Sequence, residues 1–413
     1  MLKRENYTSE HIDALRKQTG ADPSILERTV FAFGLLEALC RVRMPFIFKG
    51  GTSLLILLDE PRRLSTDIDI IAAPGTDVDS FIQQAGQIFP FRDVKEIIRK
   101  GNNGIEKRHF RFLFNSPRQG KEISILLDVV FEDNPYAKLI TKPVQSRLLM
   151  SEGDSLLVTV PDKNCVLGDK LTAFAPHTTG IPFGIDKELE IIKQMFDCWT
   201  LLQEMDDYQT VAAVYDHVAR VEAGYRGSSI QPKDVLLDTI QSCLCIMGRN
   251  GIRPDDYRHY LTGINAIQGH IFRGRINGEN AGMLACEITY LAACLLTKAD
   301  SFERVSDPEA YKDFAFTLKG MKRINYIRSV DPSISLSDAL ISAIVILRSL
   351  PFCFIYSVGL LIPLCCIARK VAGVQRKCDH QFPQSFGPKS SPLLIAGDLG
   401  KMVEYWLDVW LGI

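Results

Sequence analysis

The sequence predicts an α+β protein in which a lobe built on a mixed β-sheet precedes a mostly helical lobe. Between residues 46 and 131, short strand-like runs alternate with helical patterns, which indicates strands and helices in one mixed segment. From about residue 155 to about residue 347, apolar residues recur at helical spacing, in stretches rich in Leu, Ala and Ile. We therefore expect three segments: a mixed lobe with N-terminal helices over residues 1–150, a helical lobe over 151–347 and an atypical apolar tail over 348–413.

Local signals place the individual elements. The first 45 residues favour helices, because their apolar residues recur at helical spacing. A short strand over residues 45–48 ends at two glycines, and Thr52 can then cap a helix over residues 53–58. The other expected elements are strands over residues 67–71, 109–114 and 123–131, and helices over residues 162–174 and 187–203.

Composition and charge are those of an ordinary globular protein. The 413 residues include 48 Lys and Arg against 49 Asp and Glu, for a formal net charge of -1. A hydrophobic content of 46% and a charged content of 23% exclude collagen-like, coiled-coil and globally disordered chains. The balanced charge excludes a uniformly basic nucleic-acid coat, but it leaves room for a local basic cleft.

The cysteines and the N-terminal segment predict a cytoplasmic protein. None of the 11 cysteines forms a CxxC pair, and no nearby histidine completes a zinc-binding pattern. Their odd number, in a chain too long to need disulfides, favours reduced thiols in a core. The first residues, MLKRENYTSEHIDALRKQ, are polar and charged, and they lack the apolar region of a signal peptide.

The tail contains an apolar stretch with three competing interpretations. Residues 349–368 carry no charge and meet the length of roughly 20 residues that a membrane span needs. A membrane anchor, a buried hairpin divided at Pro351 and Pro363, and an aberrant sequence such as a shifted reading frame all fit this pattern. We favour the last two, so membrane association is not expected, and no function is inferred from this stretch.

A first candidate site is the segment Lys49-Gly50-Gly51-Thr52-Ser53-Leu54. Two glycines after a strand allow the backbone to approach a phosphate closely. The helix that follows points its unpaired N–H groups and the positive end of its dipole at the same place. A Gly-Gly pair on its own is usually only a turn, so the phosphate-binding interpretation needs support from elsewhere in the chain.

That support comes from two carboxylates about 16 residues after the glycines. Asp67 and Asp69 lie two positions apart on an expected strand, so both side chains project from one face. Mg²⁺ prefers oxygen ligands and is commonly held by one or two carboxylates together with water and substrate phosphates. An isolated D-x-D is usually a solvated strand end, but the order of glycines and acids is more specific than either part.

Asp128 is a third candidate carboxylate. The surrounding run, Ile123 to Phe131, is apolar on both faces, which predicts a central strand. Asp128 is the only charge inside the run, and a buried charge without a partner is costly. Either a metal ion or an Arg or Lys near the end of the strand would supply that partner.

Together these residues resemble the DNA polymerase beta nucleotidyltransferase superfamily. More narrowly, K-G-G-T-S-L followed by R-L-S-T-D-I-D-I resembles the AbiEii/AbiGii toxin family of bacterial toxin–antitoxin and phage-defence systems. Lys49 before the glycines and the Arg63-x-Ser65-Thr66 lead-in to the acids make the narrower resemblance strong. It covers residues 25–335 and implies a nucleotidyltransferase-like fold for the mixed lobe.

Two segments of the helical lobe extend the resemblance. Gly168-Asp169-Lys170-Leu171-Thr172-Ala173 is similar to a Glu/Asp-Lys-Leu-x-Ala element of the family. Lys193-Gln194-Met195-Phe196-Asp197 is similar to a Lys-Asp-Leu-x-Asp helix, although Gln194 stands where the family often has Asp.

The residues of these helices also have plainer interpretations. Lys170 lies within an apolar stripe, where it either reaches a triphosphate or extends its amine to solvent at the edge of the stripe. Lys193 and Asp197 have the spacing of a helical ion pair worth a few tenths of a kcal/mol. The family resemblance instead implies that Asp197 is a site carboxylate that positions Lys170 or the acceptor.

The resemblance implies a metal-dependent transfer of a nucleoside monophosphate from an NTP to an acceptor, with the 3′ end of tRNA as the favoured acceptor. It also implies a cognate antitoxin encoded nearby, and we expect no stable DNA partner. Asp67 and Asp69 would bind Mg²⁺ or Mn²⁺, and Asp128 would act as a base or as a ligand of a second metal ion. Arg63 and Lys170 would neutralise the departing pyrophosphate. The remaining nucleotide-binding residues would be Lys49, Gly50, Gly51, Thr52, Ser53 and Ser65.

Other functions are disfavoured or stay as alternatives. The sequence contains no HExxH motif, no grouping typical of a catalytic triad and no GxxxxGK[ST], which disfavours a hydrolase or a Walker P-loop. A nucleotidyltransferase acting on a small molecule or a protein is the nearest alternative, and a non-catalytic nucleotide-binding module is another. Arg108, His109 and Arg111 are weaker candidates for contacting nucleotide or RNA, because a solvated strand face is the favoured explanation for them.

Overall fold

The computed structural model describes residues 1–98, 106–226 and 229–304. The expected tail over residues 348–413, with its apolar stretch 349–368, lies outside the described residues. Contacts between residues divide the chain into two compact units. The first unit comprises Met1–Val235 and Thr262–Asn277, and the second comprises Leu236–Leu261 and the chain from Gly278 onward.

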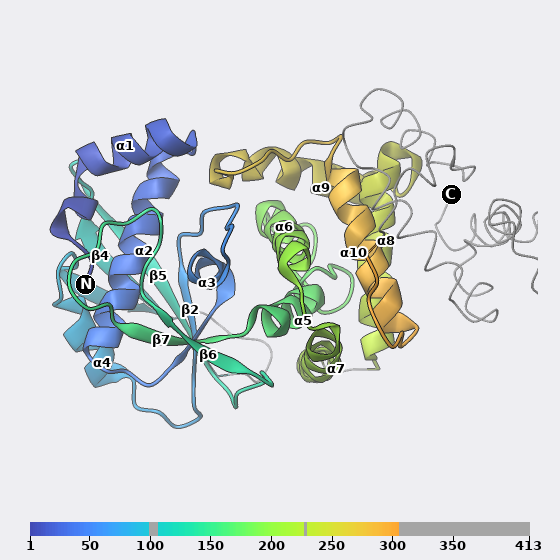
Figure 1. The fold of residues 1–413 in the computed structure, drawn as a ribbon, viewed down its shortest axis with the longest axis horizontal. Coiled ribbons are helices and arrows are strands. Elements are labelled where there is room, and N and C mark those ends of the chain that lie inside the picture. The colour runs from blue at the N-terminus through green and yellow to red at the C-terminus, as the bar shows by residue number, and fades with distance from the viewer. Residues whose placement is uncertain (99–105, 227–228, 305–413) are drawn as a thin grey trace, which may run out of the picture. The chain divides into compact units, whose positions relative to one another are not determined.

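A five-stranded mixed sheet forms the centre of the first unit (Figure 1). In spatial order its strands are β1 (Ile47–Lys49), β2 (Ile68–Ala72), β5 (Glu122–Phe131), β4 (Lys107–Asn115) and β3 (Asp93–Ile97). Strands β2 and β5 are parallel, whereas every other neighbouring pair is antiparallel. This mixed sheet, followed along the chain by helices, confirms the predicted α+β fold class.

Strand β5 is the central strand, as its apolar sequence predicted. Leu127 and Val129 are fully buried, whereas Leu126, Asp128 and Val130 between and beside them are half-buried. Successive side chains of a strand point to opposite faces, so one face of β5 belongs to the core and the other carries Asp128.

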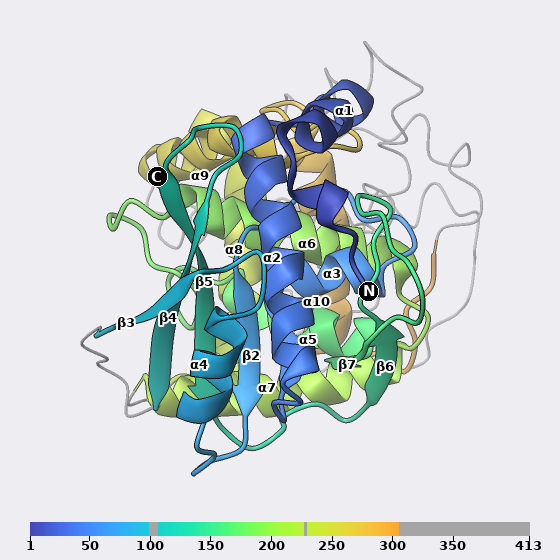
Figure 2. The same cartoon turned by 90° about the vertical axis from the view of Figure 1, so that its left-hand side faces the viewer.

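Helices α2 (Pro23–Arg41) and α4 (Asp79–Gly86) cover one face of the sheet (Figure 2). Helix α2 begins at a strong N-terminal signal, because Asp22 accepts hydrogen bonds from the N–H groups of Ser24 and Ile25. Phe31 of α2 stacks on Phe114 of β4 with ring centroids 3.7 Å apart. The N-terminal elements η1 (Arg4–Tyr7) and α1 (Ser9–Thr19) precede α2.

Helix α3 (Gly50–Leu57) joins β1 to the segment before β2, and three longer helices follow the small sheet β6 (Leu139–Pro143) and β7 (Leu157–Pro161). These are α5 (Lys163–Ala173), α6 (Glu188–Glu204) and α7 (Tyr208–Tyr225). A Cβ at Gly168 would lie 2.8 Å from the carbonyl oxygen of Val211, so the glycine allows α5 and α7 to pack closely.

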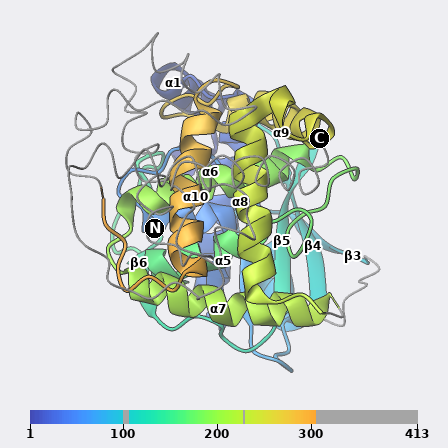
Figure 3. The same cartoon turned by 90° about the vertical axis from the view of Figure 1, so that its right-hand side faces the viewer.

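Within residues 236–261 and 278–304, the described part of the second unit consists mainly of helices. Helices α8 (Pro232–Gly248) and α9 (Pro254–Ala266) each cross the boundary between the units, and α10 (Ala281–Leu296) lies in the second. Within that unit α8 and α10 run side by side (Figure 3), where Gly282 faces Met247. The short elements η2 (Arg249–Gly251) and η3 (Ile267–His270) complete the described secondary structure.

The described cysteines and helices bear on two sequence predictions. None of the cysteines within the described ranges forms a disulfide, and most of them are buried. Burial raises the pKa of the Cys243 thiol to about 12, as for an inert thiol in a core. In the part of the chain that the structure describes, no helix has both the length and the apolar character of a membrane span.

Candidate active site

Four side-chain positions form a row across the sheet. Lys49 of β1 pairs with Asp69 of β2, Asp69 pairs with Asp128 of β5, and Asp128 pairs with His109 of β4. Residues at directly opposed positions share one face of a sheet. The strand register therefore brings together Lys49, Asp69 and Asp128, which the sequence singled out separately, and adds His109.

The two glycines are required by the side chains that approach them. Gly50 has φ of 78°, and a Cβ there would overlap the carboxylate of Asp69 and lie 2.7 Å from its Cγ. A Cβ at Gly51 would lie 2.7 Å from Nη2 of Arg63 and 2.8 Å from Oγ of Ser65. The glycines thus let an acidic and a basic side chain reach the start of α3.

Thr52 does not cap the following helix, so that expectation is wrong. Helix α3 begins at Gly50, because the positive φ of this glycine turns the chain into the helix earlier. The Thr52 hydroxyl donates to the carbonyl of Asp67 at 2.5 Å, and the Ser53 hydroxyl donates to the carbonyl of Gly50 at 2.8 Å. Both side chains are fully buried, so what this segment can offer a ligand is the N–H groups of the first turn of α3.

Asp67 directly precedes β2 and Asp69 lies in it, and the charge of Asp67 disfavours the ionised form of Asp69. Burial, followed by the charges of Asp128 and Asp67, raises the pKa of Asp69 to about 6. Burial also raises the pKa of Asp67, although the positive charge of Lys193 opposes this change. A site whose carboxylates resist ionising together is one that a bound cation would stabilise.

Lys49 supplies a positive charge beside this acidic pair. Burial alone would lower the pKa of its ammonium group, but the charges of Asp169, Glu132 and Asp69 outweigh burial and raise it. Its Nζ lies 3.7 Å from Oε1 of Glu132. Lys49 is therefore held in its charged form immediately before the glycines.

In the structure the carboxylate of Asp128 contacts a histidine. Its Oδ1 lies 2.6 Å from Nδ1 of His109, so the neighbour is a histidine and not an Arg or Lys. Arg108 binds Glu96 and Asp79 instead. Arg111 lies exposed on β4. Of the three weaker candidates, only His109 contacts one of the predicted site carboxylates.

A buried ionic network connects the segment before β2 with α5 and α6. Arg63 donates from Nε to Oδ1 of Asp197 at 2.6 Å and from Nη2 to Oδ2 at 2.7 Å. Nζ of Lys170 lies 3.0 Å from the same Oδ2. Burial would raise the pKa of Asp197, but the Arg63 and Lys170 charges outweigh burial and hold it below its usual value.

Gln194 and Lys193 of α6 lie close to this network. Lys170 Nζ donates to Oε1 of Gln194 at 2.8 Å, so the residue that departs from the family pattern contacts a predicted site lysine. The plainer alternative, a helical ion pair of Lys193 with Asp197, is not what the structure shows, because the Asp197 carboxylate binds Arg63 and Lys170. Burial and then the charge of Arg63 lower the pKa of Lys193 to about 8.

Several acidic residues near the site were not predicted. Asp169 accepts a hydrogen bond from the Tyr136 hydroxyl at 2.7 Å, and its charge acts on Lys49. Glu132 directly follows β5 and Glu222 lies on α7. The only signal for Asp169 was its place before Lys170 in the quoted motif, and nothing local marked Glu132 or Glu222.

The donor set is compatible with Mg²⁺ when substrate supplies the remaining ligands. Across the described residues, no group of three or more His, Cys, Asp and Glu side chains is arranged to hold a metal ion by itself. Asp67 and Asp69 provide two carboxylates whose raised pKa values reflect crowded negative charge. Mg²⁺ commonly takes one or two carboxylates and completes its shell with water and phosphate oxygens, so this pair fits the ion.

Comparisons with known proteins give one family match and similar solved structures. Residues 35–264, more than half of the chain, match the family described as nucleotidyl transferase AbiEii toxin, type IV toxin–antitoxin system. The solved structure of JHP933 from Helicobacter pylori is similar at 13% identity and a TM-score of 0.39, over 66% of this chain and 93% of that one. A candidate nucleotidyltransferase from H. pylori is similar at 14% identity and a TM-score of 0.37, over 67% of this chain and 98% of that one. A search of curated proteins finds no match. On the family match, the chain belongs to the AbiEii nucleotidyltransferase toxins of type IV toxin–antitoxin systems.

Proposed function

We propose that this protein transfers a nucleoside monophosphate from an NTP to the 3′ end of an RNA, with tRNA as the favoured acceptor. The observation that carries the proposal is the approach of the Asp69 carboxylate to Gly50 at the start of α3. It sets a carboxylate, which we propose binds the metal ion, beside backbone N–H groups that suit a phosphate, and nucleotidyl transfer needs both at one place. Family membership supports the same reaction class and implies an antitoxin partner.

The chain's own residues would bind and orient the triphosphate. The N–H groups of Gly50 and Gly51 lie in the first turn of α3, where an anion is favoured by unpaired donors and by the helix dipole. The charged ammonium of Lys49 lies next to them. Arg63 and Lys170 would counter the charge of the departing pyrophosphate while Asp197 fixes their positions.

Asp67 and Asp69 would hold Mg²⁺ or Mn²⁺, which when bound supplies Lewis-acid stabilisation of charge on the phosphates. Asp128 lies one strand away from Asp69 on the same face and would accept the proton of the acceptor hydroxyl. His109 would orient the Asp128 carboxylate through the 2.6 Å contact. The wider role that we propose is that of a cytoplasmic growth-inhibiting toxin in phage defence.

The test is to incubate the purified protein with α-labelled NTPs, Mg²⁺ and total cellular RNA, and then to separate RNA, protein and small molecules. We expect label in RNA of tRNA size, and we expect none from Asp69→Asn, which keeps the side-chain volume but removes its charge. Label confined to protein or to small molecules would replace the acceptor with the alternative class. No label in any fraction would refute nucleotidyl transfer.

A further inference from the structure

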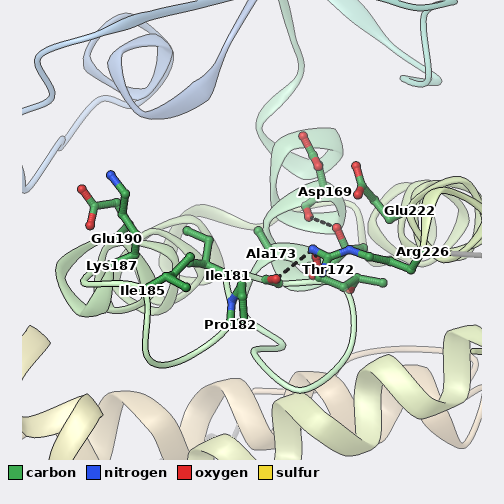
Figure 4. Close-up of a pocket in the computed structure, with 12 residues that line it drawn as sticks. Asp169, Thr172, Ala173, Ile181, Pro182, Ile185, Lys187, Glu190, Glu222 and Arg226 are labelled. Carbon is green, nitrogen blue, oxygen red and sulfur yellow. Dashed lines mark hydrogen bonds between the residues drawn. The ribbon is translucent and has the colours of Figure 1, made fainter. Parts of the chain in front are cut away.

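A cavity of about 470 Å³ lies in the helical part of the first unit. Its lining comes from the end of α5, the connection to α6, the start of α6 and the end of α7, and includes Asp169, Thr172, Ile181, Ile185, Glu222 and Arg226 (Figure 4). This volume is within the range of roughly 300–1,000 Å³ that small-molecule sites occupy. The residues predicted for the triphosphate and the metal ion are not among its lining.

The cavity is held open by fixed contacts in the connection between α5 and α6. Nη2 of Arg226 donates to the carbonyls of Thr179 and Gly180 at 2.6 and 2.9 Å. The Thr179 hydroxyl donates to the carbonyl of Thr172 at 2.6 Å. A Cβ at Gly180 would lie 2.5 Å from the carbonyl oxygen of Ala173, so only glycine permits this close turn. The shape is therefore preformed.

One side of the cavity borders the candidate active site, because the lining residue Asp169 directly precedes Lys170 on α5. The carboxylates of Asp169 and Glu222 lie next to each other and point the same way (Figure 4). The charges of both act on Lys49, which directly precedes the glycines of α3. A ligand in the cavity would thus lie beside a bound triphosphate and not on top of it.

The lining selects against a phosphate and for a neutral ligand with hydrogen-bond donors. The lining has three carboxylates, Asp169, Glu190 and Glu222, against the two cations Lys187 and Arg226. Ionised carboxylates are acceptors only, so this excess of acids disfavours a polyphosphate and favours N–H or O–H groups. Nη2 of Arg226 already donates hydrogen bonds to two carbonyls. Ile181 and Ile185 offer apolar surface for the face of a flat ring.

We propose that this cavity binds the nucleoside portion of a substrate, with Asp169 and Glu222 accepting hydrogen bonds from its base or sugar. The proposal rests on the proposed function for the identity of the ligand class. The nucleoside has two sources, the incoming NTP and the terminal residue of the RNA acceptor. Both present the same chemistry, and binding measurements distinguish them.

Two variants of the full-length protein test the cavity. Ala173→Leu adds volume at the lining, and Glu222→Gln removes an acceptor without changing size. Matched controls are Ala73→Leu at an exposed position outside the lining and Glu152→Gln, whose side chain is 69% exposed. Circular dichroism melting of all four checks that each variant folds as the parent does.

The first measurement is calorimetric titration with each NTP and with inorganic tripolyphosphate, all with Mg²⁺. If the NTP base occupies the cavity, both cavity variants weaken NTP binding by about tenfold, and Ala173→Leu leaves tripolyphosphate binding unchanged. The second measurement is fluorescence anisotropy with a short RNA and with the same RNA lacking its 3′-terminal base. If the acceptor occupies the cavity, the variants weaken the binding of the intact RNA only, and NTP binding is unchanged.

The cavity proposal is overturned if neither variant changes NTP or RNA binding relative to its control. It is also overturned if the variants weaken tripolyphosphate binding as much as NTP binding, or if they weaken the binding of both RNAs equally. These measurements require no turnover. A wild-type protein that binds nucleoside through the cavity but labels no acceptor would refute the proposed function and not the site.

Discussion

Arg63 and Asp197 form a two-pronged ion pair, with N···O distances of 2.6 and 2.7 Å, that is almost completely buried. The pair joins the segment before β2 to α6, 134 positions away in the sequence. Lys170 of α5 adds a second cation to the same carboxylate. This contact therefore connects the segment before the acidic strand β2 with α6 and, through Lys170, with α5.

Asp197→Ala should destabilise the protein by about 3–5 kcal/mol, because it leaves two buried cations without their counter-charge. The measurement is the free energy of unfolding in urea. The matched control is Asp216→Ala, which breaks the exposed i,i+4 pair with Arg220 and should cost about 0–1 kcal/mol. Equal losses for the two variants would show that the buried pair has no special structural role.

Gly50→Ala should abolish metal-dependent transfer, because the added Cβ would displace the Asp69 carboxylate. Gly75→Ala is a close control: both glycines have φ of 78°, but a Cβ at Gly75 meets nothing within 4 Å. In each variant the alanine at positive φ destabilises the backbone by about 1–2 kcal/mol. Only Gly50→Ala should also lose Mn²⁺ binding, measured by electron paramagnetic resonance. A loss in both variants would assign the effect to strain alone.

Asp128→Asn should lower kcat by about 10²–10⁴-fold, as expected for the loss of a general base. Its effect on NTP affinity should be small, because the proposed triphosphate contacts come from other residues. His109→Ala should lower kcat less, since the carboxylate remains but loses its 2.6 Å contact with Nδ1. Single-turnover kinetics and NTP titration separate the two quantities. A weakened NTP affinity with unchanged kcat would contradict these roles.

His270 should make stability depend on pH. Burial, followed by the charges of Lys193 and Arg63, lowers the pKa of His270 from 6.5 to about 4. Between these pH values the unfolded chain binds a proton that the folded chain does not. The contribution of neutral His270 to the free energy of unfolding is therefore present above pH 6.5 and is lost as the pH falls toward 4. Unfolding free energies of the wild type and His270→Gln across this range should converge as the pH falls. A difference that does not change with pH would contradict the prediction.

The parts of the fold and site that the sequence predicted are those with a local periodic signal. The run around Asp128 is apolar on both faces, and it forms the central strand β5. Asp162 and the apolar spacing after it predicted a helix, and α5 spans Lys163–Ala173. The order of glycines and acids likewise indicated that Gly50 and Asp69 would lie close together, as they do.

The contacts that the sequence did not predict depend on tertiary register. The pairing of β4 with β5 brings His109 to Asp128, and no local pattern fixes an antiparallel register between distant strands. The spacing of Lys193 and Asp197 allowed a helical ion pair as one interpretation, but the Asp197 carboxylate binds Arg63 and Lys170. Thr52 had the signature of a helix cap, yet the carbonyl of Asp67 takes its hydroxyl.

The most direct test of the account is sequencing of tRNA 3′ ends from cells that express the wild type or Asp69→Asn without any antitoxin. We predict untemplated nucleotides on tRNA 3′ ends with the wild type, together with arrested growth. With Asp69→Asn we predict unmodified ends and normal growth, because the carboxylate pair that we propose binds the metal ion is broken. Identical tRNA ends in the two strains, while the wild type still arrests growth, would contradict nucleotidyl transfer to tRNA.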